Sequence, residues 1–142
     1  MKYKLIHSSF DPVTGISKVT IGTRFGNFTA SVKTVADEKY VSSFFGCSLA
    51  ECKALRLAEK AAARQYRAEL KGLEDYFNLL KDTWSYNEND FHIRQLKRLI
   101  EKKKLDLRIA KHNAEALQIA YHNNIVDRDK TMIKLYSKEK TQ

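Results

Sequence analysis

Basic residues recur at helical spacing over residues 53–71, and these side chains are the ones most suited to recognition chemistry. Steps of three and four residues place them within about 80° of arc on one face of a helix. The residues of this basic stripe are Lys53, Arg56, Lys60, Arg64, Arg67 and Lys71. Glu51, Glu59 and Glu69 fall toward another side of the same helix. Such an array can neutralise phosphates and release counterions, or contact an acidic protein surface.

A second, looser basic row follows later in the chain. It consists of Arg94, Lys97, Lys104, Arg108 and Lys111, with Glu101 inside it. Long helices also need solvated charges, and Lys and Arg are good helix formers, so each row is either a binding surface or a solvated face. The sequence has no RNP-like aromatic motif, no zinc-finger spacing and no obvious helix-turn-helix. We therefore expect any nucleic acid to be contacted mainly through its backbone.

Residues that could support catalysis or hold a metal are scattered. Cys47 and Cys52 are five residues apart, which is not the CxxC spacing of zinc or redox sites. Neither HxxxH nor HExxH pairing is found among the histidines, which are His7, His92, His112 and His122. The candidate carboxylate ligands lie where caps and turns are expected: Glu88, Asp90, Asp127 and Asp129. We expect no metal, no cofactor and no enzyme activity; a nucleophilic thiol at a helix start is the remaining alternative.

The elements that must position these side chains begin with a small sheet. Apolar and polar residues alternate around residues 18–23 and 28–33, which is typical of half-buried strands. Turn residues at 11–15 and 25–27 separate the segments. We predict a three-stranded antiparallel meander over residues 2–10, 17–25 and 27–35, which needs cover from another element. One face would carry Leu5, Val19, Ile21, Phe28, Ala30 and Val32.

Two long helices are expected to follow and to pair as an antiparallel hairpin. Ser48 and Glu51 have the spacing of a capping box, which places a helix start there. Apolar residues then recur in steps of four and three, the spacing of a heptad seam: Cys52, Leu55, Ala58, Ala62, Tyr66, Leu70, Leu73, Phe77, Leu80 and Trp84. After a break at 87–90, a second seam carries Ile93, Leu96, Ile100, Leu107, Ala110, Ala114, Leu117 and Tyr121. Lys103 also falls at a seam position by its spacing but is charged, so it is the discordant member of this seam. The predicted helices are about 49–82 and 90–125.

The second helix also carries an apolar strip nearly opposite its seam. Its members are Phe91, Leu105, Ile109, Ala116 and Ala120. This strip could cover the sheet, meet a second copy of the chain in a homodimer, or receive another protein. The tail that follows, residues 126–142, contains Met132–Tyr136 and either adds an edge strand or frays.

Length, net charge and composition limit the class of protein to which this chain can belong. The chain has 142 residues, a length that favours one domain, and a net charge of +9. The strand and helix patterns above predict that this domain is α+β. Its expected parts are a meander and crossover (1–47), a coiled-coil-like helical hairpin (48–125) and a C-terminal tail (126–142). Two cysteines are too few for a disulfide framework, and no stretch of 18 consecutive apolar residues occurs. We therefore expect a soluble, cytoplasmic protein.

An ordered string of segments resembles small proteins encoded by phages of Gram-positive bacteria. The segments are Asp11–Gly15, Val19–Ile21, Gly26–Ala30 and the junction S-S-F-F-G-C-S-L-A-E at 42–51. In the junction Gly46 would permit a tight turn, and Phe44 and Phe45 would anchor the crossover. The resemblance implies an accessory protein acting in the bacterial host cell, in a group rich in non-enzymatic inhibitors of host machinery, anti-CRISPR proteins included. It carries over no catalytic residue.

These observations favour a non-enzymatic binding protein. Its basic helical face would engage nucleic acid or a nucleoprotein complex, such as a host defence nuclease. The alternative is a homodimeric structural or protein-interaction module that does not bind nucleic acid.

Overall fold

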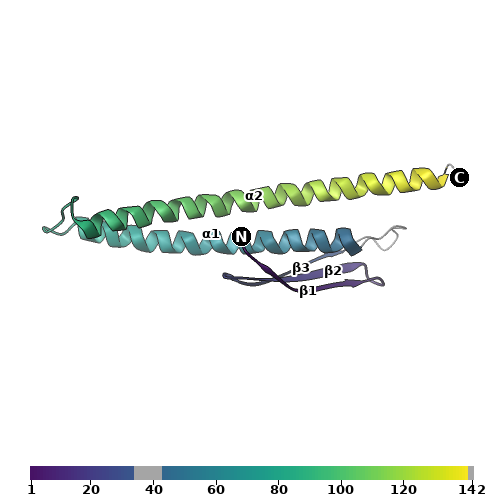
Figure 1. Ribbon diagram of the computed structural model, residues 1–142, viewed down its shortest axis with the longest axis horizontal. Coiled ribbons are helices and arrows are strands. Elements are labelled where there is room, and N and C mark those ends of the chain that lie inside the picture. Colours follow the sequence, from purple (N-terminus) through teal and green to yellow (C-terminus); the bar gives the residue numbers. More distant parts are fainter. Residues whose placement is uncertain (34–42, 141–142) are drawn as a thin grey trace. The chain divides into compact units, whose positions relative to one another are not determined.

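The computed structural model describes residues 1–33 and 43–140, with side chains described for 1–33 and 46–123. Its elements are β1 (Lys4–Asp11), β2 (Ile16–Thr23), β3 (Gly26–Lys33), α1 (Ser43–Lys81) and α2 (Phe91–Lys140) (Figure 1). The chain is α+β, as predicted, with a small sheet followed by two long packed helices. It divides into two compact units, Met1–Ala58 with Asn113–Gln142, and Glu59–His112. None of the described helices is both long and apolar enough to cross a membrane.

The predicted meander is confirmed. The strands pair antiparallel in the order β1-β2-β3. Between β1 and β2 the turn is held by the Asp11 carboxylate, which accepts a hydrogen bond from the Val13 N–H at 2.9 Å. The Gly15 N–H donates to the Asp11 carbonyl at 2.8 Å, and Gly15 has φ 73°, a conformation that glycine adopts without a Cβ clash. The turn chemistry in the sequence therefore sets the strand register.

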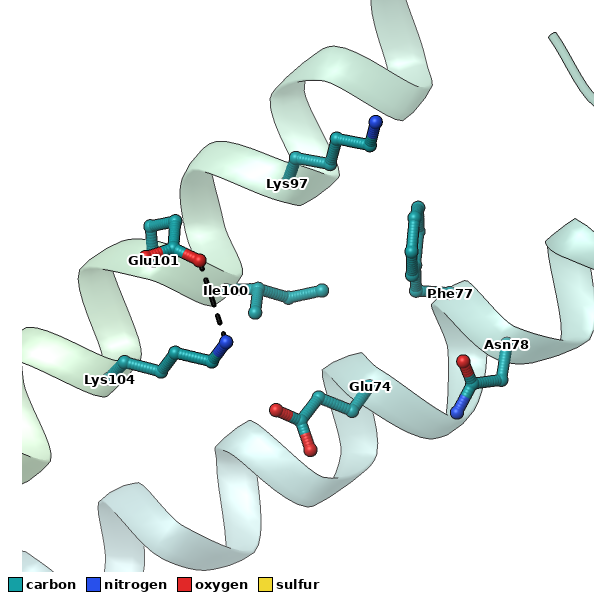
Figure 2. Close-up of a pocket in the computed structure, with 7 residues that line it drawn as sticks. All are labelled: Glu74, Phe77, Asn78, Lys97, Ile100, Glu101 and Lys104. Atoms are coloured by element: carbon teal, nitrogen blue, oxygen red, sulfur yellow. Dashed lines mark hydrogen bonds and ion pairs between the residues drawn. The ribbon is translucent and has the colours of Figure 1, made fainter. Parts of the chain in front are cut away.

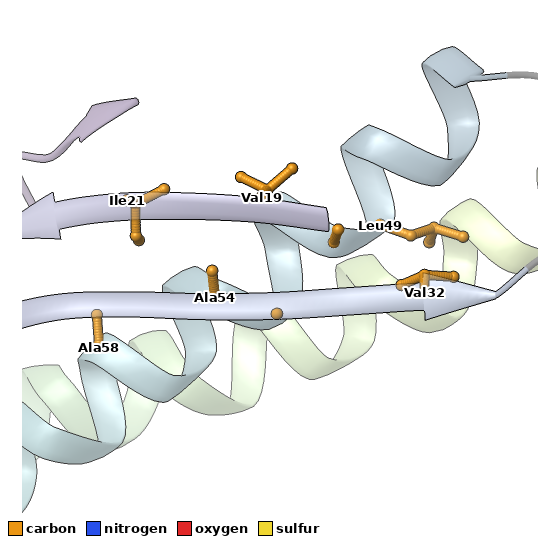
Figure 3. Close-up of a cluster of buried hydrophobic side chains, with 8 residues drawn as sticks. Val19, Ile21, Val32, Leu49, Ala54 and Ala58 are labelled. Carbon is orange, nitrogen blue, oxygen red and sulfur yellow. The ribbon is translucent and has the colours of Figure 1, made fainter. Parts of the chain in front are cut away.

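The core of the first unit lies between one face of the sheet and the beginning of α1. The register places Val19 opposite Ala30 and Ile21 opposite Phe28, so their side chains share a face. Against this face pack Leu49, Ala50, Ala54 and Ala58 of α1 (Figure 3). Alanines on the helix allow it to approach the sheet closely. Leu5 lies on the predicted face, opposite Ile21, but stays 53% exposed because the core cluster joins α1 to β2 and β3 and includes no residue of β1.

The predicted start of the first helix is wrong. α1 begins at Ser43, so Ser48 and Glu51 lie inside the helix and form no capping box. Glu51 instead accepts a hydrogen bond from the Tyr3 hydroxyl, and this bond to a carboxylate, together with partial burial, raises the pKa of Tyr3. Contacts with the sheet stabilise the early turns of α1: the Ser8 hydroxyl lies 3.4 Å from the Cys47 sulfur. Tertiary packing thus extends the helix upstream of its sequence signature.

Gly46 does not form the predicted turn; it allows α1 to approach β2 closely. It is a buried residue inside α1, and a Cβ built on it would lie 2.1 Å from Ser17 Oγ on β2. Only a residue without a side chain fits there. Residues 34–42, which belong to the predicted meander and crossover (1–47), and the side chains of Phe44 and Phe45 lie outside the described residues.

In the second unit, α1 and α2 form the predicted antiparallel hairpin. The second seam is confirmed at Ile93, Leu96, Ile100 and Ala110, which are buried. The first seam ends earlier than predicted, because the Thr83 hydroxyl donates to the Leu80 carbonyl at 2.6 Å where α1 ends. Trp84 is therefore not a seam residue; it lies in the loop and is 99% exposed.

The predicted edge strand in the C-terminal tail is wrong as well. α2 runs without interruption to Lys140, so the segment Met132–Tyr136 is helical. Neither Gly nor Pro occurs after residue 72, and Asn123 and Asn124 alone do not end a helix. Adding one residue to an existing helix costs much less than nucleating a new element, which favours continuation over a strand.

Candidate nucleic-acid interface

The structure separates the basic stripe of α1 into two groups. Lys53 donates from Nζ to the Ser31 carbonyl of β3 at 3.1 Å, and Arg56 donates from Nη2 to Gln118 Oε1 of α2 at 3.1 Å. These two residues hold the first unit together. The side chains of the stripe that belong to the second unit are exposed: Lys60, Arg64, Arg67 and Lys71.

An open groove shows which face of the hairpin these residues occupy. It encloses about 480 Å³ between the helices, with Phe77 and Ile100 pointing into it (Figure 2). Glu74 and Asn78 of α1 form one wall, and α2 supplies Lys97, Glu101 and Lys104. Steps of three and four back from Glu74 reach Lys71, Arg67, Arg64 and Lys60, whereas steps on from Lys104 reach Arg108 and Lys111. Both basic rows therefore lie on the groove side of the hairpin.

Contacts across the hairpin set the rows in register. Lys103 pairs with Glu69 and lies 5.3 Å from the centre of the Tyr66 ring, and Lys97 lies 5.9 Å from that of Phe77. In an antiparallel pair the numbers of residues at the same level have a nearly constant sum, which for these three contacts is about 169–174. Arg64 thus lies near the level of Arg108, Lys60 near that of Lys111, and Arg67 near that of Lys104. We call these six residues the hairpin basic face.

Little of the charge on the hairpin basic face is neutralised. All six side chains are exposed, and within the described part of the chain Lys104 alone among them forms an ion pair, with Glu101 at 3.5 Å. Asp106 is two positions from both Lys104 and Arg108, a separation at which helical side chains do not face each other. The result is three pairs of exposed cations at matching levels of the two helices, five of them without an ion-pair partner among the described residues.

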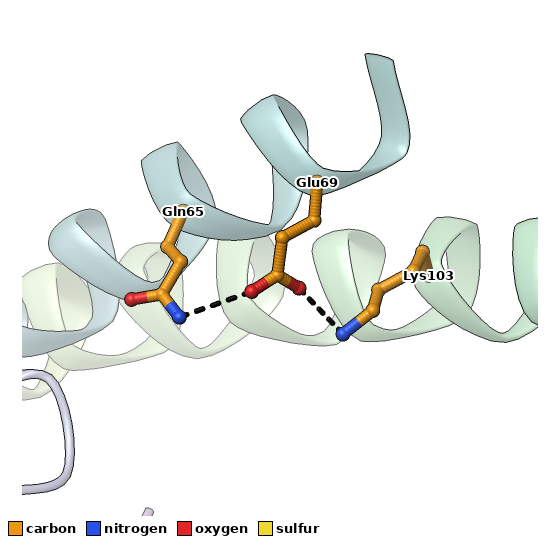
Figure 4. A network of polar contacts seen from close by, with 3 residues as sticks. All are labelled: Gln65, Glu69 and Lys103. Atoms are coloured by element: carbon orange, nitrogen blue, oxygen red, sulfur yellow. Dashed lines mark hydrogen bonds and ion pairs between the residues drawn. The ribbon is translucent and has the colours of Figure 1, made fainter. Parts of the chain in front are cut away.

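Two acidic residues of α1, Glu59 and Glu69, lie toward the seam, as the sequence predicts, whereas Glu74 lines the groove. Glu59 is buried. Glu69 accepts a hydrogen bond from Gln65 Nε2 at 3.1 Å, and Lys103 Nζ lies 2.5 Å from its other oxygen (Figure 4). This pairing also explains Lys103, the discordant member of the second seam, because its half-buried ammonium has a carboxylate partner across the hairpin.

The thiol and metal candidates are not drawn together into a site. Burial raises the pKa of the Cys52 thiol, and its S–H donates to the Leu117 carbonyl at 3.2 Å. A buried, protonated thiol is a poor nucleophile. Among the residues with described side chains, no group of three or more His, Cys, Asp or Glu is arranged to hold a metal ion. Of the histidines, His92 contacts a neighbour, the Tyr76 hydroxyl, at 3.1 Å from Nε2.

The apolar strip of α2 is not the cover of the sheet, since α1 supplies that cover. Phe91 is 68% exposed, and Leu105 and Ile109 are each about half exposed at 49% and 48%. The homodimer and the protein-partner interpretations of this strip both stay open.

The sequence pattern does not predict the exposure of Trp84, which lies in the loop between the helices. Its spacing from Leu80 instead places Trp84 in the seam. The signal against that assignment was Asp82-Thr83 directly before it, residue types that favour helix ends and turns over helix interiors.

Comparisons with known proteins identify no family for this chain. No protein-family model matches it, and neither a curated protein nor a solved structure is significantly similar to it.

Proposed function

We propose that this protein binds nucleic acid through its hairpin basic face and acts without catalysis. The observation that carries the proposal is the register of two cationic rows on one face, with Lys60, Arg64 and Arg67 opposite Lys111, Arg108 and Lys104. Paired rows of Lys and Arg match the regular negative charge of a phosphate backbone. Glu59 and Glu69 of α1 do not interrupt the row, and Glu74 lies beyond its end at the groove.

The chemistry favours backbone contact over base reading. All six side chains are lysines or arginines, and among the described residues only Lys104 of the six forms an ion pair. Flexible cations of this kind neutralise phosphates but carry no sequence information. We therefore expect affinity that depends strongly on salt and weakly on sequence.

The test is a salt titration of binding to labelled duplex DNA, single-stranded DNA and RNA. Replacing Lys60, Arg64, Arg67 and Arg108 by Gln removes four cations while keeping good helix formers. On duplex, the slope of log affinity against log salt should fall by about 0.9 for each lost phosphate contact. Lys53 and Arg56 are left intact because both support the fold.

A matched variant controls for net charge. Lys18, Lys33, Arg98 and Lys102 are exposed and lie outside the hairpin basic face, so their replacement by Gln lowers the charge by the same amount. We expect the control to keep the wild-type salt slope. Equal loss of affinity in both variants would reduce the proposal to non-specific attraction by a basic protein.

The resemblance to phage proteins supports a setting for this activity. We propose that the nucleic acid is part of a host nucleoprotein complex, such as a CRISPR nuclease, which the protein inhibits by occupying a backbone-binding surface. Addition of the purified protein to such a nuclease should then reduce target cleavage, and the four-fold Gln variant should not.

The exposed strip supports a second candidate, a homodimeric interaction module. Phe91, Leu105 and Ile109 expose enough apolar surface for a helix-to-helix contact, and paired helical strips are a common route to symmetric dimers. This candidate needs no nucleic acid, so the titration above separates it from the first.

A further inference from the structure

The loop that joins the helices presents a tryptophan wholly to solvent. Trp84 is 99% exposed, and Phe91 at the start of α2 is 68% exposed. A single exposed apolar side chain is common on protein surfaces, but an uncovered indole offers a large aromatic face on which a planar ligand can stack. Trp84 is also the single tryptophan of the chain.

The backbone on both sides of Trp84 is held in place. The Tyr86 N–H donates to the Thr83 carbonyl at 3.2 Å, which closes a turn with Trp84 at its corner. Further along the loop, the Asn89 N–H donates to Asn87 Oδ1 at 3.0 Å, and the His92 N–H donates to Asp90 Oδ1 at 2.8 Å. The indole is therefore displayed by an organised loop.

The same loop is joined to the groove beside the hairpin basic face. Tyr86 packs edge-to-face on Phe77, with ring centroids 6.3 Å apart, and Phe77 points into the groove. Two cations flank that ring: Lys81 Nζ at 5.1 Å and Lys97 Nζ at 5.9 Å from its centroid. A strand whose phosphates follow the basic rows and then Lys97 arrives at the loop.

The charge of the loop indicates which part of that strand it can hold. Residues 82–90 include Asp82, Glu88 and Asp90 and no Lys or Arg, so the loop itself repels phosphates. Bases are uncharged and stack on aromatic faces, but they are accessible only where the nucleic acid is unpaired.

We propose that Trp84 stacks on an unpaired base, so that the protein prefers single-stranded over duplex nucleic acid. This inference rests on the proposed function, since the hairpin basic face must first bind the backbone. It adds a preference that the cationic rows alone do not provide, because duplex and single strands both carry phosphates.

The experiment uses Trp84 as its own reporter. A thymidine oligonucleotide should quench the tryptophan emission of the 142-residue chain on binding, whereas a duplex of equal length should bind without comparable quenching. Trp84→Ala should weaken single-strand binding about 5- to 150-fold, the range expected for one stacked base. It should leave duplex affinity and the salt slope unchanged, and Trp84→Phe should restore part of the loss.

The outcomes separate this inference from the proposed function. Binding of both probes with neither quenching nor an effect of Trp84→Ala overturns the stacking role and leaves backbone binding in place; Trp84 is then a candidate contact for a protein. Equal losses on both probes also overturn it. Failure of the wild type to bind either probe at low salt overturns both proposals.

Discussion

At the scale of single residues, substitutions at two glycines inside α1 are expected to change the free energy of unfolding in opposite directions. Gly46→Ala places a Cβ 2.1 Å from Ser17 Oγ, a buried oxygen on β2, so the helix or the strand must shift. We expect a loss of about 1–3 kcal/mol of unfolding free energy, even though Ala is the better helix former. The measurement is urea unfolding at neutral pH.

Gly72 provides the matched control. It is also helical, but a Cβ built there meets no atom within 4 Å. Gly72→Ala should therefore stabilise the protein by up to about 1 kcal/mol through helix propensity alone. If both substitutions stabilise, the close approach of α1 to β2 is not as described.

Asp11 predicts a specific dependence of stability on pH. The Val13 N–H, followed by Thr14, donates hydrogen bonds to its carboxylate, which lowers the pKa of Asp11 in the folded state. Stabilisation by this group is then fully present above the unfolded pKa, about 4, and is lost as the pH falls through the lower folded pKa. Asp11→Asn keeps the acceptor but does not titrate, so its unfolding free energy should vary less with pH below about 5 than that of the wild type.

At the scale of the elements, the hairpin contains one half-buried ion pair whose contribution can be measured. Lys103 and Glu69 retain side-chain exposures of 26% and 37%, so solvent screens their attraction. A double-mutant cycle with Glu69→Leu and Lys103→Leu should give a coupling of about 0.5–1 kcal/mol.

The double-leucine variant tests whether the ion pair between Lys103 and Glu69 stabilises the hairpin more than an apolar contact would. Replacing both partners by apolar residues in a seam is commonly neutral or stabilising, so this variant should unfold no earlier than the wild type. Each single variant should be less stable than the double variant, because it leaves a charge without its partner. A double variant far less stable than both singles would contradict this account.

At the scale of the whole molecule, the two functional candidates predict different behaviour in light scattering. If the strip on α2 forms a homodimer, the wild type has twice the mass of one chain, and Leu105→Glu with Ile109→Glu converts it to a monomer. Both positions are about half exposed, so the substitutions should not unfold the hairpin. A monomeric wild type removes the dimer alternative and leaves the hairpin basic face as the supported site.

The sequence by itself determined the local architecture. Period-two alternation and turn residues located all three strands, and the seam residues Ile93, Leu96 and Ile100 identified the buried side of α2. These features follow from backbone geometry and local periodicity, which neighbouring residues encode directly. The orientation of Glu59 and Glu69 away from the basic stripe was predictable for the same reason.

Only the tertiary structure decided which of these residues work together. Lys53 and Arg56 share the spacing of Arg64, but contacts with Ser31 and Gln118 assign them to the fold. The pairing of Arg64 with Arg108 depends on the register of two helices far apart in sequence, and helical spacing within either one carries no information about it. Likewise the helix start at Ser43 and the exposure of Trp84 arise from packing and from where the helices end, which long-range contacts determine.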